Sequence, residues 1–274
     1  MNRTALALAL TLTAGAASAY ERSTTSRGAP LEWNQRVIHF ALNAAGSDDI
    51  ELAALEAEVQ RAFAPWAEHT CAIIEFPYDG LTDAGADLDD IGFDLEGPNE
   101  NVVVFREERE DWRVIDAATG RPRESTIIAV TTVTFCEEKG GQCDLPGEIL
   151  DADIEVNGAF FRFSIDQTPP ANRFDLRNTL THEVGHLLGF DHTPDTEATM
   201  FASAPVGETK KRSLEEDDIA ALCDVYARIY DERKGSDDDC RAAPGADGSP
   251  APALLLLAGL AWRSRRRRLT ADRS

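Results

Sequence analysis

Three of the five histidines of the chain lie close together, at positions 182, 186 and 192. Residues four apart lie on the same face of an α-helix, so His182 and His186 would be neighbours on a helix. Gly189 can adopt left-handed backbone conformations without steric cost, and we expect it to end the helix and return the chain so that His192 joins the pair. Three neutral imidazoles with one open position suit a catalytic zinc ion. The spacing therefore predicts one zinc ion bound by His182, His186 and His192.

Glu183 directly follows the first of these histidines. On a helix this offset places its carboxylate beside the metal rather than on it, where it can act as a general base. Zinc acidifies a water, and the water attacks a carbonyl whose oxygen the metal stabilises. The alternative is that the histidines only fill a core, but a chance match at five fixed positions is on the order of 10⁻⁵. The residues therefore predict hydrolysis at a carbonyl, with Glu183 as the general base.

The hydrophobic pattern indicates the elements that must position these side chains. Their order is strand, helix, several strands and two further helices, which is typical of a mixed α and β fold in one domain. We expect Asp48 and Glu51 to form a capping box on the first helix and Ser213 to be the N-cap of the last. The expected strands are residues 37–42, 71–76, 101–105, 125–135 and 148–157, and the expected helices are residues 47–68, 172–188 and 212–233.

Acidic and apolar residues alternate in the segment 148–157. In a strand this pattern places Asp151, Asp153 and Glu155 on one face and the apolar residues on the other. The segment 79–100 is rich in Asp and Gly and is expected to be a loop.

The histidine motif resembles the extended zinc signature of the metzincin peptidases, with Gly189 at the position of the family's glycine. Ala198-Thr199-Met200 looks like the methionine turn of that family, which gives Met200 a structural role beneath the metal. Three further matches are similar to the matrixin branch. They are Asp195, the Ala152-Asp153-Ile154 segment, and Leu214 to Ile219 followed by Val225-Tyr226.

The resemblance implies an α+β fold with a twisted, mostly parallel five-stranded sheet and three helices, in which the methionine turn follows the active-site helix. It also implies a zinc endopeptidase that acts on protein or peptide substrates. The substrate would lie antiparallel to an edge strand, here about residues 148–157, by strand addition. Residues 201–205 would form the wall of the pocket just beyond the scissile bond.

The chain departs from the matrixin pattern in two places, of which the first concerns the branch of the family and the second the metal content. Thr193 replaces the serine that usually follows the third histidine. The loop rich in His and Gly, which binds a structural zinc and calcium in animal matrixins, has no counterpart, because His39 and His69 are isolated. We therefore expect a single zinc ion. Calcium is a second ion that the acidity and the resemblance allow.

Five cysteines suggest disulfide bonds in an exported protein. Cys136 and Cys143 bracket a turn that contains two glycines, so a small disulfide-closed hairpin is expected there. Cys71 and Cys223 would form a second bridge between the start of a strand and the last helix, although spacing alone leaves the connectivity open. Cys240 is then left over, in the tail.

The ends of the chain indicate export. Residues 1–19 have the form of a signal peptide, with Arg3, a short apolar run and an Ala-x-Ala site. A polar leader at 20–30 precedes the expected protease domain at 31–235, and a disordered linker follows at 236–252. The apolar and Arg-rich segment 253–274 is similar to myxobacterial-type sorting tails, and the alternative is a weak membrane anchor. We expect a monomer that is secreted or attached to the cell surface.

The net charge of −22 excludes nucleic acid as a partner, because such a surface repels phosphates. Three functions fit the remaining pattern. The first is an endopeptidase. The second is a narrow-specificity aminopeptidase on the same site, and the third is a surface binding module without turnover. The complete set of His182, Glu183, His186 and His192 favours an active enzyme.

Overall fold

The computed structural model describes residues 20–86, 91–93, 99–112 and 125–234. The expected signal peptide, linker and tail, as well as Cys240, lie outside these residues. No helix of the described part is both long and apolar enough to cross a membrane.

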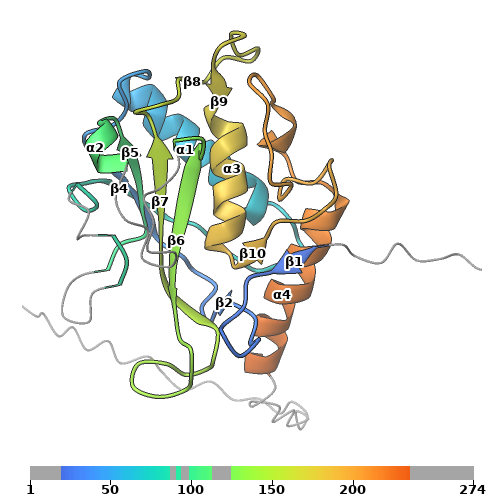
Figure 1. Cartoon of the computed structure of the whole chain (residues 1–274). Helices are drawn as coiled ribbons and strands as arrows, with labels where there is room; N and C mark the ends of the chain where they lie inside the picture. The colour runs from blue at the N-terminus through green and yellow to red at the C-terminus, as the bar shows by residue number, and fades with distance from the viewer. Residues whose placement is uncertain (1–19, 87–90, 94–98, 113–124, 235–274) are drawn as a thin grey trace, which may run out of the picture. The chain divides into compact units, whose positions relative to one another are not determined.

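One mixed sheet forms the framework (Figure 1). Its central strand β7 lies between β5, which is parallel to it, and β6, which is antiparallel. Beyond β5 come β3 and β4, both parallel, and the two-residue β2 pairs with the start of β7. The expected five-stranded, mostly parallel sheet is therefore confirmed, with β2 as a short addition. The strands are β2 (Glu32–Trp33), β3 (Phe40–Asn43), β4 (Tyr78–Thr82), β5 (Val102–Arg106), β6 (Ala129–Phe135) and β7 (Glu148–Asn157).

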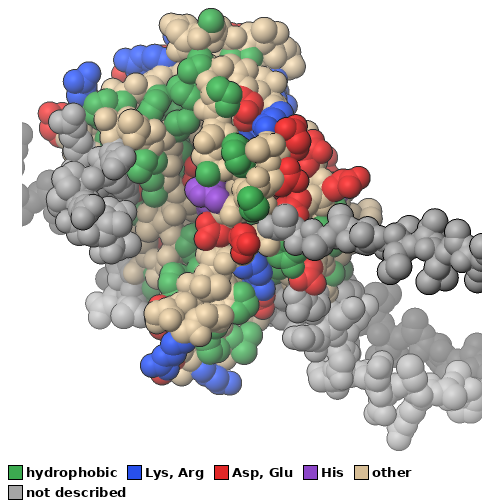
Figure 2. All heavy atoms as spheres, turned by 45° about the vertical axis from the view of Figure 1, so that its right-hand side comes forward, with side chains coloured by type: hydrophobic (Ala, Val, Ile, Leu, Met, Phe, Trp, Pro, Cys, Tyr) green, Lys and Arg blue, Asp and Glu red, His purple; other side chains and the backbone are tan. Residues whose placement is uncertain are grey.

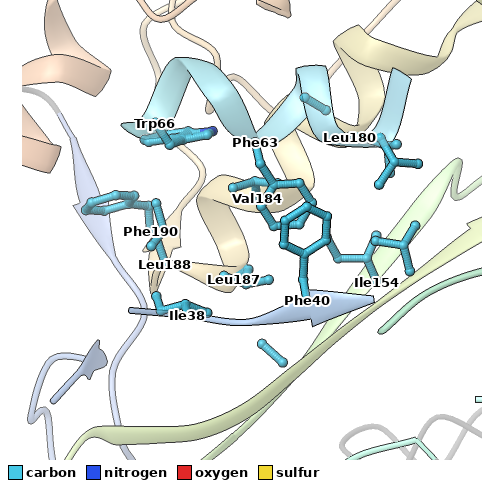
Figure 3. Packing of buried hydrophobic residues seen from close by; sticks show 14 of the residues in the cluster. Ile38, Phe40, Phe63, Trp66, Ile154, Leu180, Val184, Leu187, Leu188 and Phe190 are labelled. Atoms are coloured by element: carbon cyan, nitrogen blue, oxygen red, sulfur yellow. The ribbon is translucent and has the colours of Figure 1, made fainter. Parts of the chain in front are cut away.

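Two helices, α1 and α3, pack against each other and against the sheet (Figure 3). Phe63 of α1 stacks on Phe40 of β3 with ring centroids 3.8 Å apart. Val184 and Leu187 of α3 meet the same cluster, and both are buried. The helices are α1 (Leu52–Ala67), α2 (Arg109–Trp112), α3 (Leu176–Leu187) and α4 (Glu216–Lys234), with a 3₁₀ turn η2 at Lys210–Arg212.

Buried aromatic side chains hold α3 in place by hydrogen bonds as well as by packing. Each donates to a main-chain carbonyl at the helix or at its C-terminal end, so that a polar atom is satisfied inside an apolar core. The pairs are Trp66 to Thr181 O, Trp33 to Leu187 O and Tyr226 to Leu188 O. Because these donors come from three separate parts of the chain, the position of α3 depends on the whole domain.

The acidic and apolar faces of β7 are both covered by protein. Asp151, Asp153 and Glu155 are all at most 2% exposed. The guanidinium of Arg106 pairs with Glu155 at 2.7 Å and donates to the carbonyl of Gly85. Gly92 N donates to Asp153 as well, so the described residues of the segment after β4 help to cover this face.

Helix α1 begins later than expected. Glu51 is its N-cap and accepts from Ala54 N, whereas the main-chain N–H of Asp48 donates to Glu107. The expected capping box is therefore wrong, because Glu51 is itself the N-cap and the distant Glu107 accepts from the N–H of Asp48.

The second strand also lies later than expected. Residues 71–76 form a turn after α1 and a single bridge between Val37 and Glu75, and the strand itself is β4 at 78–82. Cys71, at the start of this segment, is joined to Cys223 of α4 by a disulfide. Helix α4 begins at Glu216, and Asp218 accepts from Glu215 N, so Ser213 is not its N-cap.

The segment 20–30, expected to be a polar leader before the domain, is folded onto the domain. Its strand β1 (Glu21–Arg22) pairs antiparallel with β10 (Phe190–Asp191), and the Arg22 side chain binds Leu31 O and Glu32. Main-chain pairing needs no apolar side chains, so the polar composition gave no signal. One further pair of two-residue strands joins β8 (Phe163–Ser164) to β9 (Phe174–Asp175).

Both expected disulfides are present. Cys71 and Cys223 join the end of α1 to α4 across 152 residues of sequence. Cys136 and Cys143 close the loop between β6 and β7.

Candidate active site

Helix α3 places His182 and His186 one turn apart. It begins at Leu176, where the Asp175 carboxylate accepts from Asn178 N at 2.8 Å and so caps the helix. The expected start near residue 172 is too early, because residues 174–175 form β9 instead. The helix ends at Leu187 with Leu188 as its C-cap.

Gly189 turns the chain back toward the helix. Its φ is +86°, a conformation that favours glycine, and a Cβ there would lie 2.5 Å from the carbonyl oxygen of Leu31. The chain then forms β10 and reaches His192. The Nε2 atom of His192 lies 3.2 Å from the Nε2 atoms of both His182 and His186. The three histidines expected to act together are therefore brought together.

Hydrogen bonds determine which nitrogens of His182 and His186 face this point. His182 Nδ1 lies 2.7 Å from Thr199 O, and His186 Nδ1 lies 2.8 Å from Phe190 O. A carbonyl only accepts, so each Nδ1 carries the proton and each Nε2 presents a lone pair. Burial lowers the pKa of both histidines, well below the usual value for His182, which keeps the imidazoles neutral.

This donor set fits zinc. In a tetrahedral site with Zn–N bonds of about 2.0–2.1 Å, the nitrogens lie about 3.3 Å apart, close to the spacing seen here. Within the described residues, the triad is the one group of three or more His, Cys, Asp or Glu side chains with such geometry. His192 is its exposed member, and Figure 2 shows histidine at the surface between apolar and acidic side chains. Residues 87–90 and 94–98 of the Asp-rich segment 79–100 lie outside the described residues.

The methionine segment packs directly beneath the helix. Met200 is 4% exposed, and a Cβ on Gly185 would lie 2.1 Å from its sulfur, so only glycine fits there. The carboxylate of Asp218 in α4 accepts from Thr199 N at 2.7 Å and from Met200 N at 3.1 Å. Sequence reasoning missed the roles of Gly185 and Asp218, since each depends on a contact between distant segments.

Glu183 is buried and held by a residue that sequence reasoning also missed. Thr131 of β6 lies with its hydroxyl 2.7 Å from Glu183 Oε2 and 3.1 Å from Glu183 O. Burial raises the pKa of Glu183 to about 7, and the Thr131 hydrogen bond opposes this rise. A threonine in a strand is ordinary, so no sequence signal marked Thr131.

A cleft of about 630 Å³ lies in front of these residues. One wall is β6, the other is α3 with the segment after Met200, and Ser23 and Thr24 of the N-terminal segment complete it. The expected edge strand, residues 148–157, is wrong for this role, because β7 is paired on both sides. Among the described residues β6 pairs with β7 alone, so its other edge is free, and β6 residues line the cleft. Ala202 and Ala204 line the cleft as expected for the segment 201–205.

Comparison with known proteins agrees with this geometry. The profile of the Matrixin family matches residues 32–227. Among curated proteins, Metalloendoproteinase 1 of Glycine max is 39% identical over 62 residues, which is 23% of this chain and 20% of that protein. Metalloendoproteinase 1-MMP of Arabidopsis thaliana is 42% identical over 52 residues, or 19% and 14% of the two chains.

Matrilysin of Homo sapiens is 35% identical over 54 residues, which is 20% of each chain. The matched segments thus span a fifth or less of these relatives. The family profile, in contrast, covers the sheet, the three long helices and the histidine triad. The chain therefore belongs to the matrixin family.

Proposed function

We propose that this protein is a zinc-dependent endopeptidase in which His182, His186 and His192 hold the metal and Glu183 is the general base. The observation that carries the proposal is the convergence of three imidazole Nε2 atoms beside a buried carboxylate in an open cleft. Membership in the matrixin family supports the same activity.

Each residue has a distinct role in this mechanism. The free edge of β6 pairs with an extended substrate in antiparallel orientation and holds the scissile carbonyl at the triad. A bound zinc ion supplies Lewis-acid chemistry, acidifying water and stabilising negative charge on the carbonyl oxygen. Glu183 accepts the proton of the attacking water and transfers it to the leaving amine. Thr131 orients the Glu183 carboxylate, and Met200 supports the histidines from below.

The test compares the full-length wild type with Glu183→Ala on a library of quenched, N-blocked peptides. We expect the wild type to bind one zinc per chain, to cut internal bonds and to stop when a chelator is added. Glu183→Ala should keep zinc and lose at least about 10²-fold in rate, the lower range for a general base. Glu216→Ala, an exposed glutamate at the start of α4, is the matched control and should retain full activity.

Other results would select another function. Zinc binding without cleavage of any internal bond rejects the endopeptidase. Cleavage only from a free N-terminus would identify an aminopeptidase, and the absence of all turnover would identify a binding module.

We further propose that the protein is exported and acts as a monomer at or outside the cell surface, with residues 1–19 as the signal peptide. Two disulfide bonds support an oxidising compartment. The tail at 253–274 would direct sorting or anchoring. N-terminal sequencing of the mature protein tests the signal peptide, and a start other than Tyr20 would argue against this cleavage site.

A further inference from the structure

A buried lysine lines the same cleft as the histidine triad. Lys211 belongs to the turn η2 and is 2% exposed, yet it lies on the wall of the cleft. Its main-chain N–H donates to Asn178 Oδ1 at 2.8 Å, which ties η2 to the first turn of α3. Its ammonium donates to the carbonyl oxygen of Phe201, the residue after Met200. These contacts hold the ammonium at the lining of the cleft.

The ammonium of Lys211 has more hydrogen-bond donors than the described residues use. A lysine has three N–H donors, and the described residues give this one a single carbonyl and no ion pair. The adjacent basic residues do form ion pairs: Lys210 lies 3.8 Å from Glu197, and Arg212 pairs with Asp175. Burying a charge is costly unless it is paired. The arrangement therefore suits an anionic group that arrives with a ligand.

Carboxylates near Lys211 influence it without pairing with it. Burial lowers the pKa of Lys211, whereas the charges of Glu208, Glu183 and Asp218 raise it. Glu208 is not among the residues that line the cleft, and its Oε1 is buried without a hydrogen-bond partner. A carboxylate entering from the cleft would thus meet the ammonium directly.

The strand direction shows which substrate residue reaches Lys211. Helix α3 starts at the end of the sheet where β6 also starts, and the two run in the same direction (Figure 1). Thr131 lies at Glu183, so Ile127 and Ala129 lie beside the first turns of α3, near Asn178. In a substrate antiparallel to β6, the residues that follow the scissile bond would therefore lie at this end of the strand. The side chains of Ala202 and Ala204 are small and leave room there.

We propose that Lys211 selects an acidic side chain, aspartate or glutamate, in the substrate residue that directly follows the scissile bond. This proposal rests on the proposed function and adds a substrate class to it. The bound side-chain carboxylate forms a charge-assisted hydrogen bond with the ammonium, shielded from water by the cleft.

The test uses N-blocked, C-amidated quenched peptides that differ only at the position after the scissile bond, with Glu, Gln, Asp, Asn or Leu there. We expect the full-length wild type to cleave the Glu peptide with a kcat/KM roughly 10- to 100-fold above that of the Gln peptide, the range of one hydrogen bond to a charged group. In Lys211→Met this ratio should fall to about 1. The matched control Lys210→Met, outside the cleft, should keep the wild-type ratio.

Lys211→Gln provides a second uncharged variant if Lys211→Met does not fold, and zinc content reports folding for both. A wild-type ratio near 1 overturns the proposal without any variant. A high ratio that persists in the folded Lys211 variants also overturns it. A further comparison uses peptides that end at the residue after the scissile bond, either as a free acid or as an amide. Preference for the free acid without preference for Glu over Gln would assign Lys211 to a terminal carboxylate, and the proposal would fail.

Failure here and failure of the proposed function give different results. If no peptide is cut internally, the endopeptidase itself is rejected. If peptides are cut but Glu and Gln are equivalent, only the role of Lys211 is rejected.

Discussion

The proposed general base depends on a side chain from a different element. Glu183 is on α3, but the hydroxyl that contacts its carboxylate belongs to Thr131 on the edge strand. A buried carboxylate with a raised pKa needs such a donor, because water no longer orients it. The same strand is the one expected to bind substrate, so Thr131 couples the position of the base to the position of the scissile bond.

Replacing Thr131 with valine should therefore lower kcat. Valine keeps the shape and removes the donor, so we expect a roughly tenfold or larger decrease in kcat with little change in KM or zinc content. Thr131→Ser should restore most of the rate. Thr132→Val is the matched control, because Thr132 does not line the cleft. Steady-state kinetics would contradict this role if KM alone changed, or if serine failed to rescue.

At the scale of elements, β7 carries a pair of buried carboxyl groups that do not line the cleft. Asp153 accepts N–H groups from Gly92 and Val102 and is hydrogen-bonded to Asp151. Burial and the neighbouring Asp153 charge raise the pKa of Asp151, and burial also raises that of Asp153. The pair is therefore best accommodated with a proton, which Asp151 provides as the donor to Asp153.

This pair predicts a stability that falls as pH rises. The folded-state pKa lies above the unfolded value of about 3.9, so the contribution is complete below that value and is lost as pH rises through the raised pKa. Asp151→Asn donates at every pH. Relative to wild type it should gain at least about 1.4 kcal/mol between pH 5 and pH 9, the equivalent of one pKa unit.

Denaturant unfolding at pH 5, 7 and 9 measures this difference. The exposed Asp83→Asn serves as the control and should follow the wild type. A parallel pH dependence in wild type and Asp151→Asn would mean that the pair does not hold a proton in the folded state.

At the scale of the whole domain, segments that are distant in the sequence meet around α3. The N-terminal segment pairs with β10, and Tyr20 donates to Asp224 of α4. Trp33 and Tyr226 bind carbonyls at the end of α3, and the Cys71–Cys223 bridge joins α1 to α4. The geometry of the three histidines is thus a property of the assembled domain, and metal binding should in turn stabilise that assembly.

Removal of zinc should lower the melting temperature of the domain. A ligand at about 1,000 times its Kd stabilises the folded state by about 4 kcal/mol, which corresponds to a Tm shift on the order of 10 °C for a domain of this size. Calorimetry with and without a chelator measures the shift, and added zinc should reverse it. His192→Ala lacks one ligand and should respond much less. An equal response would show that zinc stabilises the domain through other residues.

The spacing of neighbouring residues predicted the histidine motif and the order of the elements. The helical offset of His182 and His186, the adjacent Glu183 and the turn at Gly189 depend on a few neighbouring residues, and the structure brings the histidines together as that spacing predicts. The order of strands and helices followed from hydrophobic periodicity for the same reason. The helix starts at 48–51 and 213–216 were wrong because other nearby residues, Glu51 and Asp218, accept the capping hydrogen bonds. The strand at 71–76 was wrong because β4 at 78–82 pairs with β3 instead.

Only the tertiary structure decided which strand borders the cleft and what surrounds the carboxylate of Glu183. The edge position belongs to β6 because β7 acquires partners on both sides, and no alternation pattern records the number of neighbours. Thr131 and Lys211 contribute to the cleft from positions 52 residues before and 28 residues after Glu183. Such contacts depend on how distant segments pack, and packing is a property of the folded chain as a whole.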